Sequence, residues 1–234
     1  MSSTFIISTR FAFIDSGIEL HVAFFSTGDE LKSIGETLNE GDIYDSNRYT
    51  LFALLKNLDV EIIDLGVIRD TQKNIENAFI SAAELADIVI TSGGVSVGEA
   101  DFIKPTLKKL GDTHFWKIAM KPGRPLTFGS YHDSWFFGLP GNPVAVMVTF
   151  MTFVQPAISY LASGSIKTPI IIKAHCQQAI KKRAGRTEYI RAILEQSDDG
   201  ELNVKLTGKQ GSGILMSREN QYPLMSCASR CVRK

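Results

Sequence analysis

Three loops in the middle third of the chain combine glycines, prolines and fixed charges with short apolar runs. Ser92–Asp101 reads SGGVSVGEAD, Phe115–Pro125 reads FWKIAMKPGRP, and Gly138–Pro143 reads GLPGNP. Ligands of open parallel sheets bind outside the carboxyl ends of the strands, where such loops lie. Two lysines and two carboxylates among the three loops therefore predict a pocket for an anionic ligand at the edge of a parallel sheet.

The first of these loops has the composition of a phosphate-binding turn. Its two adjacent glycines permit a sharp turn and a close backbone approach, and its N–H groups and serine hydroxyls suit a phosphate. Glu99 and Asp101 would repel an anion, so their presence suggests a Mg²⁺ ion between ligand and protein. A surface turn with no ligand is the alternative. The residues expected to bind the ligand here are Ser92, Gly93, Gly94, Ser96 and Gly98.

Lys117 and Lys121 are four residues apart in a segment, Phe115–Met120, that we interpret as a buried strand. Side chains alternate along a strand, so both lysines would lie on one face. Two like charges on one face favour an anion between them, and Arg124 follows within reach. A solvated sheet edge with extended lysine side chains is the alternative.

Other loops are expected at the same edge. In GLPGNP, Pro143 suits the first turn of a helix and Asn142 is a capping residue, so the helix start could face an anionic or carbonyl-rich group. A capped helix without a ligand is the alternative. STGDEL, with Glu30, and GVIRD, with Asp70, also follow predicted strands and add acidic side chains.

The segment 21–161 alternates strand-like and helix-like stretches. Strands are predicted at Val22–Ser26, Val60–Leu65, Asp87–Thr91, Phe115–Met120 and Ser134–Leu139. Helices are predicted at Asp45–Asn57, Thr71–Ala86, Lys104–Leu110 and Pro143–Leu161. This order predicts a doubly wound α/β fold with a mostly parallel sheet and helices on both faces.

A change of pattern after Ala162 predicts a second domain. Strands are expected at Ile170–Ala174, Glu188–Leu194 and Leu202–Leu206, with a turn at Asp198–Gly200. We therefore divide the chain into an N-terminal segment (1–20), an α/β domain (21–161), a small β domain (169–215) and an irregular tail (216–234).

Bulk composition excludes several classes of protein. The 234 residues contain 25 basic and 25 acidic side chains, so no basic excess predicts nucleic-acid binding. Three cysteines do not suggest a disulfide framework and fit a reducing compartment. We see no apolar run near the ~20 residues that span a bilayer, so we expect no membrane segment and a cytoplasmic location.

In order along the chain, STGDEL, GDIYDSN, LGVIRD, SGGVSVGEAD, FWKIAMKPGRP and GLPGNPVAVMVTF resemble the molybdopterin molybdenumtransferase (MoeA) family. The similarity extends from about Val22 to Gly213. It implies a molybdopterin-binding, MogA-like α/β domain followed by a small β-barrel-like domain. It also implies insertion of molybdate into adenylylated molybdopterin with release of AMP, a Mg²⁺ cofactor, and a homodimer in the full-length family.

The resemblance also implies roles for individual residues. Glu30, Asp70 and Asp101 match acidic active-site positions, and Asp70 and Asp101 would hold the metal ion. Lys117 and Lys121 match the family's basic pair. Further ligand-binding positions are Pro140, Gly141, Asn142, Arg191 and Ser212.

Members of that family carry two further domains before STGDEL, so we interpret the sequence as a shortened member. The alternative function is a non-catalytic carrier or scaffold that binds molybdopterin without inserting the metal. A nicotinamide-dependent dehydrogenase on a similar sheet is disfavoured, because no G-x-G-x-x-G motif follows the first strand of the α/β domain.

Overall fold

The computed structural model describes residues 2–7, 19–94, 102–115, 117–165, 170–180, 185–207, 210 and 211. They fall into two units. The α/β unit lies within Phe13–Ile118 and Gly123–Ile166. The β unit draws on Met1–Ala12, Ala119–Pro122 and Lys167–Lys234.

A six-stranded sheet with the order β5-β2-β6-β10-β9-β7 forms the centre of the α/β unit. Its strands are β2 (Leu20–Thr27), β5 (Val60–Ile68), β6 (Ile88–Ser92), β7 (Asp112–Phe115), β9 (Thr127–Tyr131) and β10 (Ser134–Leu139). The first four in spatial order are parallel, β9 is antiparallel to β10, and β7 is antiparallel to β9. The predicted mostly parallel α/β fold is confirmed.

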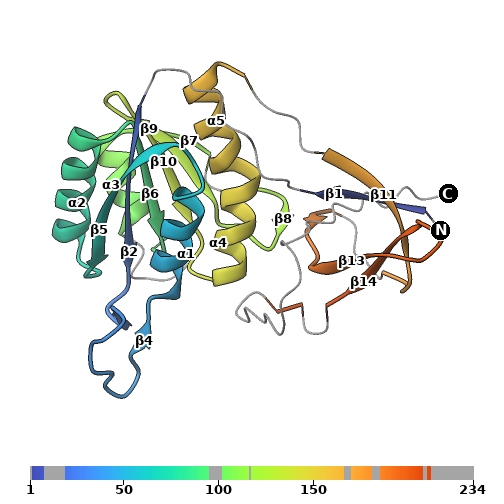
Figure 1. Ribbon diagram of the computed structural model, residues 1–234. Coiled ribbons are helices and arrows are strands. Elements are labelled where there is room, and N and C mark those ends of the chain that lie inside the picture. Colours follow the sequence, from blue (N-terminus) through green and yellow to red (C-terminus); the bar gives the residue numbers. More distant parts are fainter. Residues whose placement is uncertain are drawn as a thin grey trace. The chain divides into compact units, whose positions relative to one another are not determined.

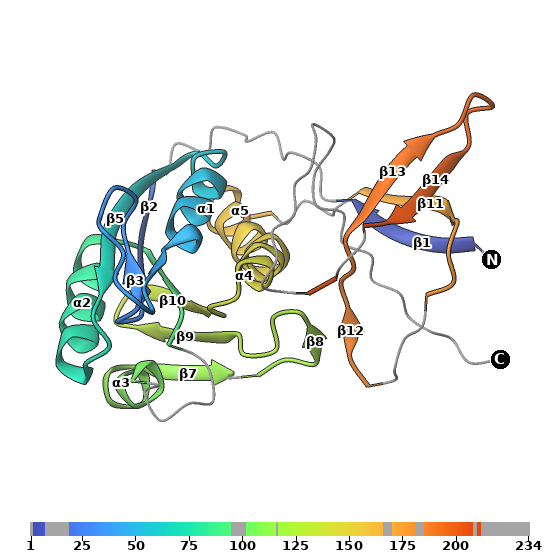
Figure 2. The same ribbon diagram turned by 90° about the horizontal axis from the view of Figure 1, so that it is seen from below.

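Helices cover both faces of this sheet (Figures 1 and 2). The helical segments are α1 (Ser46–Leu55), α2 (Gln72–Leu85), α3 (Ile103–Leu110), α4 (Pro143–Thr149), the π-helical turn η1 (Phe150–Val154) and α5 (Gln155–Ser163). Different helices contribute to the core on each face of the sheet. On one face pack α1, α4, η1 and α5, and on the other face pack α2 and α3.

Strand β2 shows why the sheet is buried on both faces. Val22 and Phe24 pack toward α1 and the helix that follows β10, whereas Ala23 and Phe25 pack toward α2 and α3. All four side chains are fully buried. A near-continuous apolar run is what a central parallel strand requires, because it has no solvated face.

The starts of the first two helices agree with the sequence. Asp45 accepts a hydrogen bond from the Arg48 amide (3.0 Å), and Thr71 accepts one from the Asn74 amide (3.3 Å). At the start of α4, Asn142 occupies the cap position without a side-chain hydrogen bond, so the predicted capping role of its side chain is wrong. Leu85, the last residue of α2, is 55% exposed.

One helical segment contradicts the expectation of no long apolar run. Pro143–Ser163 has 21 residues and a mean hydropathy of 1.6, enough by length and composition to cross a membrane. Four of its side chains, Val146, Phe150, Val154 and Ile158, are nevertheless buried in the core of the α/β unit. Side chains spaced four residues apart shift gradually around an α-helix, which has 3.6 residues per turn. The wider π-helical turn η1 offsets part of this shift and keeps the four side chains toward the core.

The predicted buried strand Phe115–Met120 is wrong. β7 ends at Phe115, Lys117 is exposed, and Ile118 closes a loop by donating to the Arg124 carbonyl (3.1 Å). The two-residue strand β8 (Met120–Lys121) belongs to the β unit. The alternating apolar residues resembled a strand, but Ile118 and Met120 belong to different units.

The antiparallel strand β9 was missed. A two-residue turn at His132–Asp133 joins it to β10, with His132 in the left-handed region (φ 50°). Gly129 in its centre weakens the strand signal in the sequence. A Cβ at this position would lie 2.4 Å from the Asp112 carbonyl oxygen, so the glycine permits close pairing with β7.

The β unit contains a four-stranded sheet with the order β1-β11-β14-β13 (Figure 2). Its strands are β1 (Ser2–Ile7), β11 (Ile170–Cys176), β13 (Ala192–Gln196) and β14 (Leu202–Leu206). Ala174, Ala192 and Val204 form its buried core. Closure into a barrel stays a prediction, and the tail 216–234 lies outside the described residues.

The single strand predicted at Glu188–Leu194 is divided in the structure. β12 (Thr187–Glu188) pairs with β8, whereas β13 pairs with β14 across the turn predicted at Asp198–Gly200. The two halves of the segment therefore have different partners, which a single-strand interpretation could not anticipate.

We expect Ser134→Ala to lower the free energy of unfolding by about 1–3 kcal/mol, because it leaves a buried carbonyl unpaired. The Ser134 hydroxyl is buried and donates to the Ala86 carbonyl oxygen (2.6 Å), with the Ala83 carbonyl oxygen 3.0 Å away. Urea denaturation measures the change. Ser81→Ala, at an exposed position in α2, is the control; equal stability of the two variants would contradict the expectation.

Candidate active site

The four parallel strands bring several predicted loops to one edge of the sheet. Ser26 of β2 is in register with Ser92 of β6, Ser92 with Leu139 of β10, and Thr27 with Ile68 of β5. The loops that follow these positions contain Glu30, Asp70, Gly93–Gly94 and Pro140–Asn142. The structure thus brings together these site residues from four separate segments of the sequence.

A tight glycine turn follows β6. Gly93 and Gly94 have φ angles of 91° and 62°, in the left-handed region that favours glycine. A Cβ on Gly93 would lie 2.6 Å from the Thr27 carbonyl oxygen, and one on Gly94 would lie 2.8 Å from the Thr27 hydroxyl oxygen. The Gly93 amide donates to the Leu139 carbonyl (3.2 Å). The turn is therefore held directly against the ends of β2 and β10.

The loop after β10 is fixed from a different direction. The Asn47 side-chain amide, in the first turn of α1, donates to the Gly141 carbonyl (2.7 Å). Asn47 is 8% exposed, and Pro140 is also buried. Gly141 lies beside Gly93, since a Cβ built on it would be 3.7 Å from the Gly93 Cα. Three segments thus meet at this point.

Acidic side chains gather at the ends of β2 and β5. The Asp70 amide donates to the Asp29 carboxylate (3.2 Å), and Glu30 folds back over Gly28. Burial, together with the charges of Asp29 and Glu30, raises the pKa of Asp70. One Asp70 carboxylate oxygen, Oδ1, is buried without a hydrogen-bond partner. A bound cation, or a hydrogen-bond donor from a ligand, would stabilise the buried Asp70 charge and give Oδ1 the partner that it lacks.

Buried polar atoms without partners are concentrated around this edge. Among the described residues, they include Ser26 Oγ, Thr27 Oγ1, Asp45 Oδ2, Asn47 Oδ1, Asp70 Oδ1, Thr91 Oγ1 and Ser92 Oγ. Native proteins rarely leave such atoms unpaired, because each costs about 1–3 kcal/mol. Their clustering at the strand ends indicates a place for a polar ligand and its water.

The described carboxylates do not form a complete metal site by themselves. In the part of the chain that the structure describes, no group of three or more His, Cys, Asp or Glu side chains could hold a metal ion. Mg²⁺ keeps several water molecules and is usually held by one or two carboxylates together with substrate phosphates. Asp70, with its unpartnered oxygen, fits that kind of partial site.

The predicted basic residues come from other segments of the chain. Lys117 is exposed on the loop after β7, so the argument that a strand places it on one face with Lys121 is wrong. Lys121, in β8, lies 3.9 Å from the Glu188 carboxylate within the β unit. In the same unit, the Arg191 guanidinium donates to the Gly211 carbonyl (2.9 Å), next to Ser212 in the sequence.

Four predicted site residues lie outside the described residues, namely Ser96, Gly98, Asp101 and Ser212. The structure adds others that the sequence analysis did not select: Ser26, Thr27 and Asn47. A signal for the first two exists, since β2 is apolar from Val22 to Phe25 and then ends in two hydroxyl residues directly before Gly28. Asn47 is identified only by its contact with Gly141.

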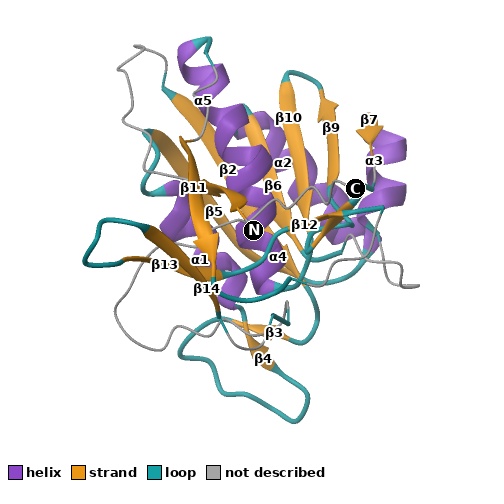
Figure 3. Ribbon diagram, turned by 90° about the vertical axis from the view of Figure 1, so that its right-hand side faces the viewer, coloured by secondary structure: helices purple, strands orange, loops and turns teal. Residues whose placement is uncertain are grey.

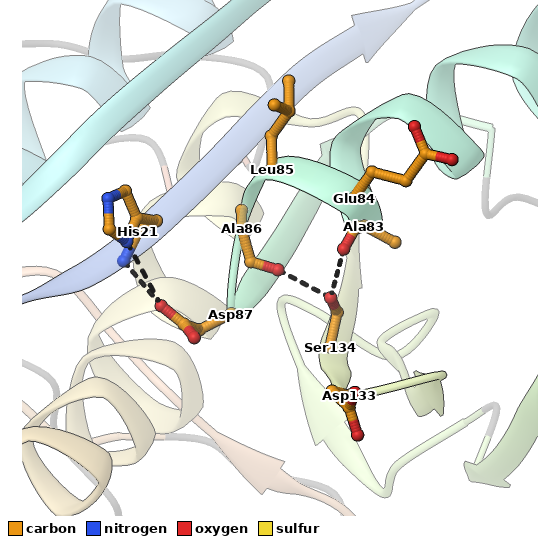
Figure 4. A pocket seen from close by; sticks show the side chains of 8 residues that line it. All are labelled: His21, Ala83, Glu84, Leu85, Ala86, Asp87, Asp133 and Ser134. Carbon is orange, nitrogen blue, oxygen red and sulfur yellow. Dashed lines mark hydrogen bonds and ion pairs between the residues drawn. The ribbon is translucent and has the colours of Figure 1, made fainter.

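A separate pocket lies at the opposite edge of the sheet, where the parallel strands begin (Figure 4). It has a volume of about 300 Å³ and is lined by residues that include His21, Asp87 and Ser134. The His21 amide donates to the Asp87 carboxylate (2.8 Å), which also lies 3.7 Å from the imidazole. None of the predicted site residues lines this pocket.

Comparison with known proteins assigns a family to most of the α/β unit. Residues 23–160, more than half of the chain, match the family model described as a probable molybdopterin binding domain. The chain belongs to this molybdopterin-binding family. Residues 173–218 also match the MoeA C-terminal region, domain IV, so part of the β unit has a family assignment of its own.

Curated relatives of this family member are about twice as long as the matched region. The molybdopterin molybdenumtransferase of Haemophilus influenzae is 48% identical over 197 residues, which cover 84% of this chain and 49% of the relative. The Nostoc enzyme of the same name is 39% identical over 202 residues and is covered to 46%. The chain therefore spans about half the length of the curated relatives that it matches.

A solved structure supports the fold. The molybdopterin biosynthesis MoeA protein of Pyrococcus horikoshii matches with a TM-score of 0.65 and 29% identity. The match covers 84% of this chain and 46% of that one.

We expect Gly93→Ala to be more destabilising than Gly66→Ala. Both glycines have positive φ angles, 91° and 79°, which cost alanine about 1–2 kcal/mol. Only at Gly93 would the added Cβ meet a neighbour, the Thr27 carbonyl oxygen, and such overpacking adds about 1–3 kcal/mol. Denaturant unfolding of both variants measures the difference, and equal losses would show that the turn is not closely packed.

We expect Asp70→Asn to raise the free energy of unfolding at pH 7, by less than about 1 kcal/mol since solvent screens this half-buried group. The folded protein raises the pKa of Asp70, so its favourable contribution is present below the unfolded pKa and is lost as pH rises through the folded pKa. The advantage of the variant should disappear below the ordinary value of 3.8. Thermal unfolding from pH 3 to 7 measures this, with exposed Asp59→Asn as the control; a less stable variant at pH 7 would contradict it.

Proposed function

We propose that this chain binds adenylylated molybdopterin and inserts molybdate into it with release of AMP. The observation that carries the proposal is the Gly93–Gly94 turn at the carboxyl edge of a molybdopterin-binding domain, surrounded by buried hydroxyls without partners. A family relative with 48% identity bears the name molybdopterin molybdenumtransferase, which supports this reaction.

The glycine turn would bind the phosphate part of the substrate. With no side chain at two successive positions, the backbone can approach the ligand closely, and Ser92 supplies a buried hydroxyl. The loop Pro140–Asn142 would bound the site on the β10 side. Ser96 and Gly98 belong to the same proposed cradle on the resemblance alone.

Basic residues would bind molybdate and neutralise the charge that develops on the phosphate. Lys117, Lys121, Arg191 and Ser212 have this role in the proposal. A lysine ammonium acts as a point charge, which suits a tetrahedral oxyanion. Fixed positive charge stabilises the negative charge that develops on a phosphate in the transition state. The effect on the rate is large, because a preorganised site needs no reorganisation during the reaction.

The acidic residues would serve a divalent ion and the substrate. Asp70, with Asp101, would hold Mg²⁺, and the unpartnered Oδ1 of Asp70 supports the first assignment. When bound, Mg²⁺ supplies positive charge to the phosphoanhydride. Glu30 would orient the pterin or a water molecule at the rim of the site.

The setting of the reaction is part of the same proposal. We propose a homodimer and a cytoplasmic location, with neither nucleic acid nor a membrane as a partner. The equal numbers of acidic and basic residues support the absence of a nucleic-acid partner. The burial of one face of Pro143–Ser163 against the sheet supports the absence of a membrane partner.

We expect Lys121→Ala to reduce AMP release by about 100-fold, the typical effect of removing one group that stabilises transition-state charge. The chain is incubated with adenylylated molybdopterin, molybdate and Mg²⁺, and AMP is measured by liquid chromatography. Lys173→Ala, which removes an exposed lysine from β11 of the same unit, is the control.

Full activity of Lys121→Ala would remove Lys121 from the mechanism. If the unaltered chain binds the substrate but releases no AMP, the enzymatic proposal fails for this chain. The alternative function, a carrier or scaffold for molybdopterin, would then be supported.

A further inference from the structure

Thr27 is the last residue of β2, and it lies at the centre of the cluster of loops. It is 4% exposed, and its hydroxyl oxygen is buried without a hydrogen-bond partner. That oxygen is 2.8 Å from the position of a Cβ on Gly94 and 3.3 Å from that of a Cβ on Gly93. The hydroxyl therefore lies directly beneath the glycine turn.

The same hydroxyl also lies next to the acidic side of the site. It is close enough to the Asp70 carboxyl group to lower the pKa of that group, against the larger opposite effect of burial. The two side chains nevertheless do not complete a hydrogen bond of good geometry. Thr27 thus stands between the turn expected to bind an anion and the carboxylate expected to bind a cation.

The fold gives this oxygen no hydrogen bond of good geometry. Valine has nearly the shape of threonine and is equally suited to a strand. A buried hydroxyl that lacks a partner lowers stability, whereas a methyl group in its place would not. Natural proteins tolerate such costs mainly where the group acts on a ligand, because function and stability compete at binding sites.

We propose that Thr27 is a ligand-binding residue whose hydroxyl donates a hydrogen bond to an oxygen of the phosphate held by the Gly93–Gly94 turn. This inference rests on the proposed function, since adenylylated molybdopterin provides that phosphate. Neither glycine has a Cβ, which at Gly94 would lie 2.8 Å from both this hydroxyl oxygen and the Ile103 side chain. Ser26 and Ser92, in register on β2 and β6, carry similar buried hydroxyls, but neither is placed beneath the turn by a comparable contact.

Three variants test the inference. Thr27→Val removes the hydroxyl and keeps the shape, and Thr27→Ser keeps the hydroxyl. Thr106→Val removes another fully buried, unpartnered hydroxyl, in the middle of α3, and is the matched control. Calorimetry measures the affinity of each variant for adenylylated molybdopterin, and thermal unfolding without ligand measures stability.

We expect Thr27→Val to weaken binding by about 10- to 100-fold, the effect of one hydrogen bond to a charged group. Its unfolding temperature without ligand should be equal to or above that of the unaltered chain. Thr27→Ser should restore most of the affinity, and Thr106→Val should bind as the unaltered chain does.

Each other result contradicts the inference. If the unaltered chain binds and Thr27→Val binds equally well, Thr27 does not contact the ligand, while the proposed function stands. If Thr27→Val is less stable without ligand and Thr27→Ser does not restore binding, the role of Thr27 is structural. If the unaltered chain does not bind, the proposed function fails and this inference fails with it.

Discussion

The contact between the end of β2 and the turn after β6 is the constraint on which the site depends. The Thr27 carbonyl oxygen lies only 2.6 Å from where a Cβ of Gly93 would be, so a residue without a side chain allows the two segments to meet this closely. This contact places the buried Thr27 hydroxyl beneath the turn. It also fixes the turn against β10, since the Gly93 amide donates to Leu139.

The sheet supplies the rigid support for this contact. β2 and β6 are buried on both faces, and helices from both sides pack against them. Parallel strands end at the same edge, so residues far apart in the sequence meet there without long loops. Stability and function have opposite requirements at that edge: the core is apolar and closely packed, whereas the strand ends hold polar atoms without partners and a carboxyl group of raised pKa.

The basic residues depend on a different part of the structure. Lys121 and Arg191 belong to the β unit, which includes Ser2–Ile7 and Met120–Lys121 in addition to the strands after residue 170. The chain leaves the α/β unit after Ile118 and returns at Gly123, so two lysines only four residues apart belong to different units. The glycine turn and Asp70 thus belong to the α/β unit, whereas Lys121 and Arg191 belong to the β unit.

The sequence alone was sufficient for the α/β order, the four parallel strands, the helices of the α/β unit and the loops at the carboxyl edge. These features depend on local patterns: apolar runs, helical spacing and glycine or proline at turns. Only the tertiary structure decided that 115–120 is not one strand, that β9 pairs within the sheet, and which groups surround Thr27 and Asn47. The physical reason is that each of these depends on a neighbour distant in sequence: an apolar run becomes a strand only if a partner edge is available, and a hydroxyl is unpaired only when its surroundings offer nothing to bind.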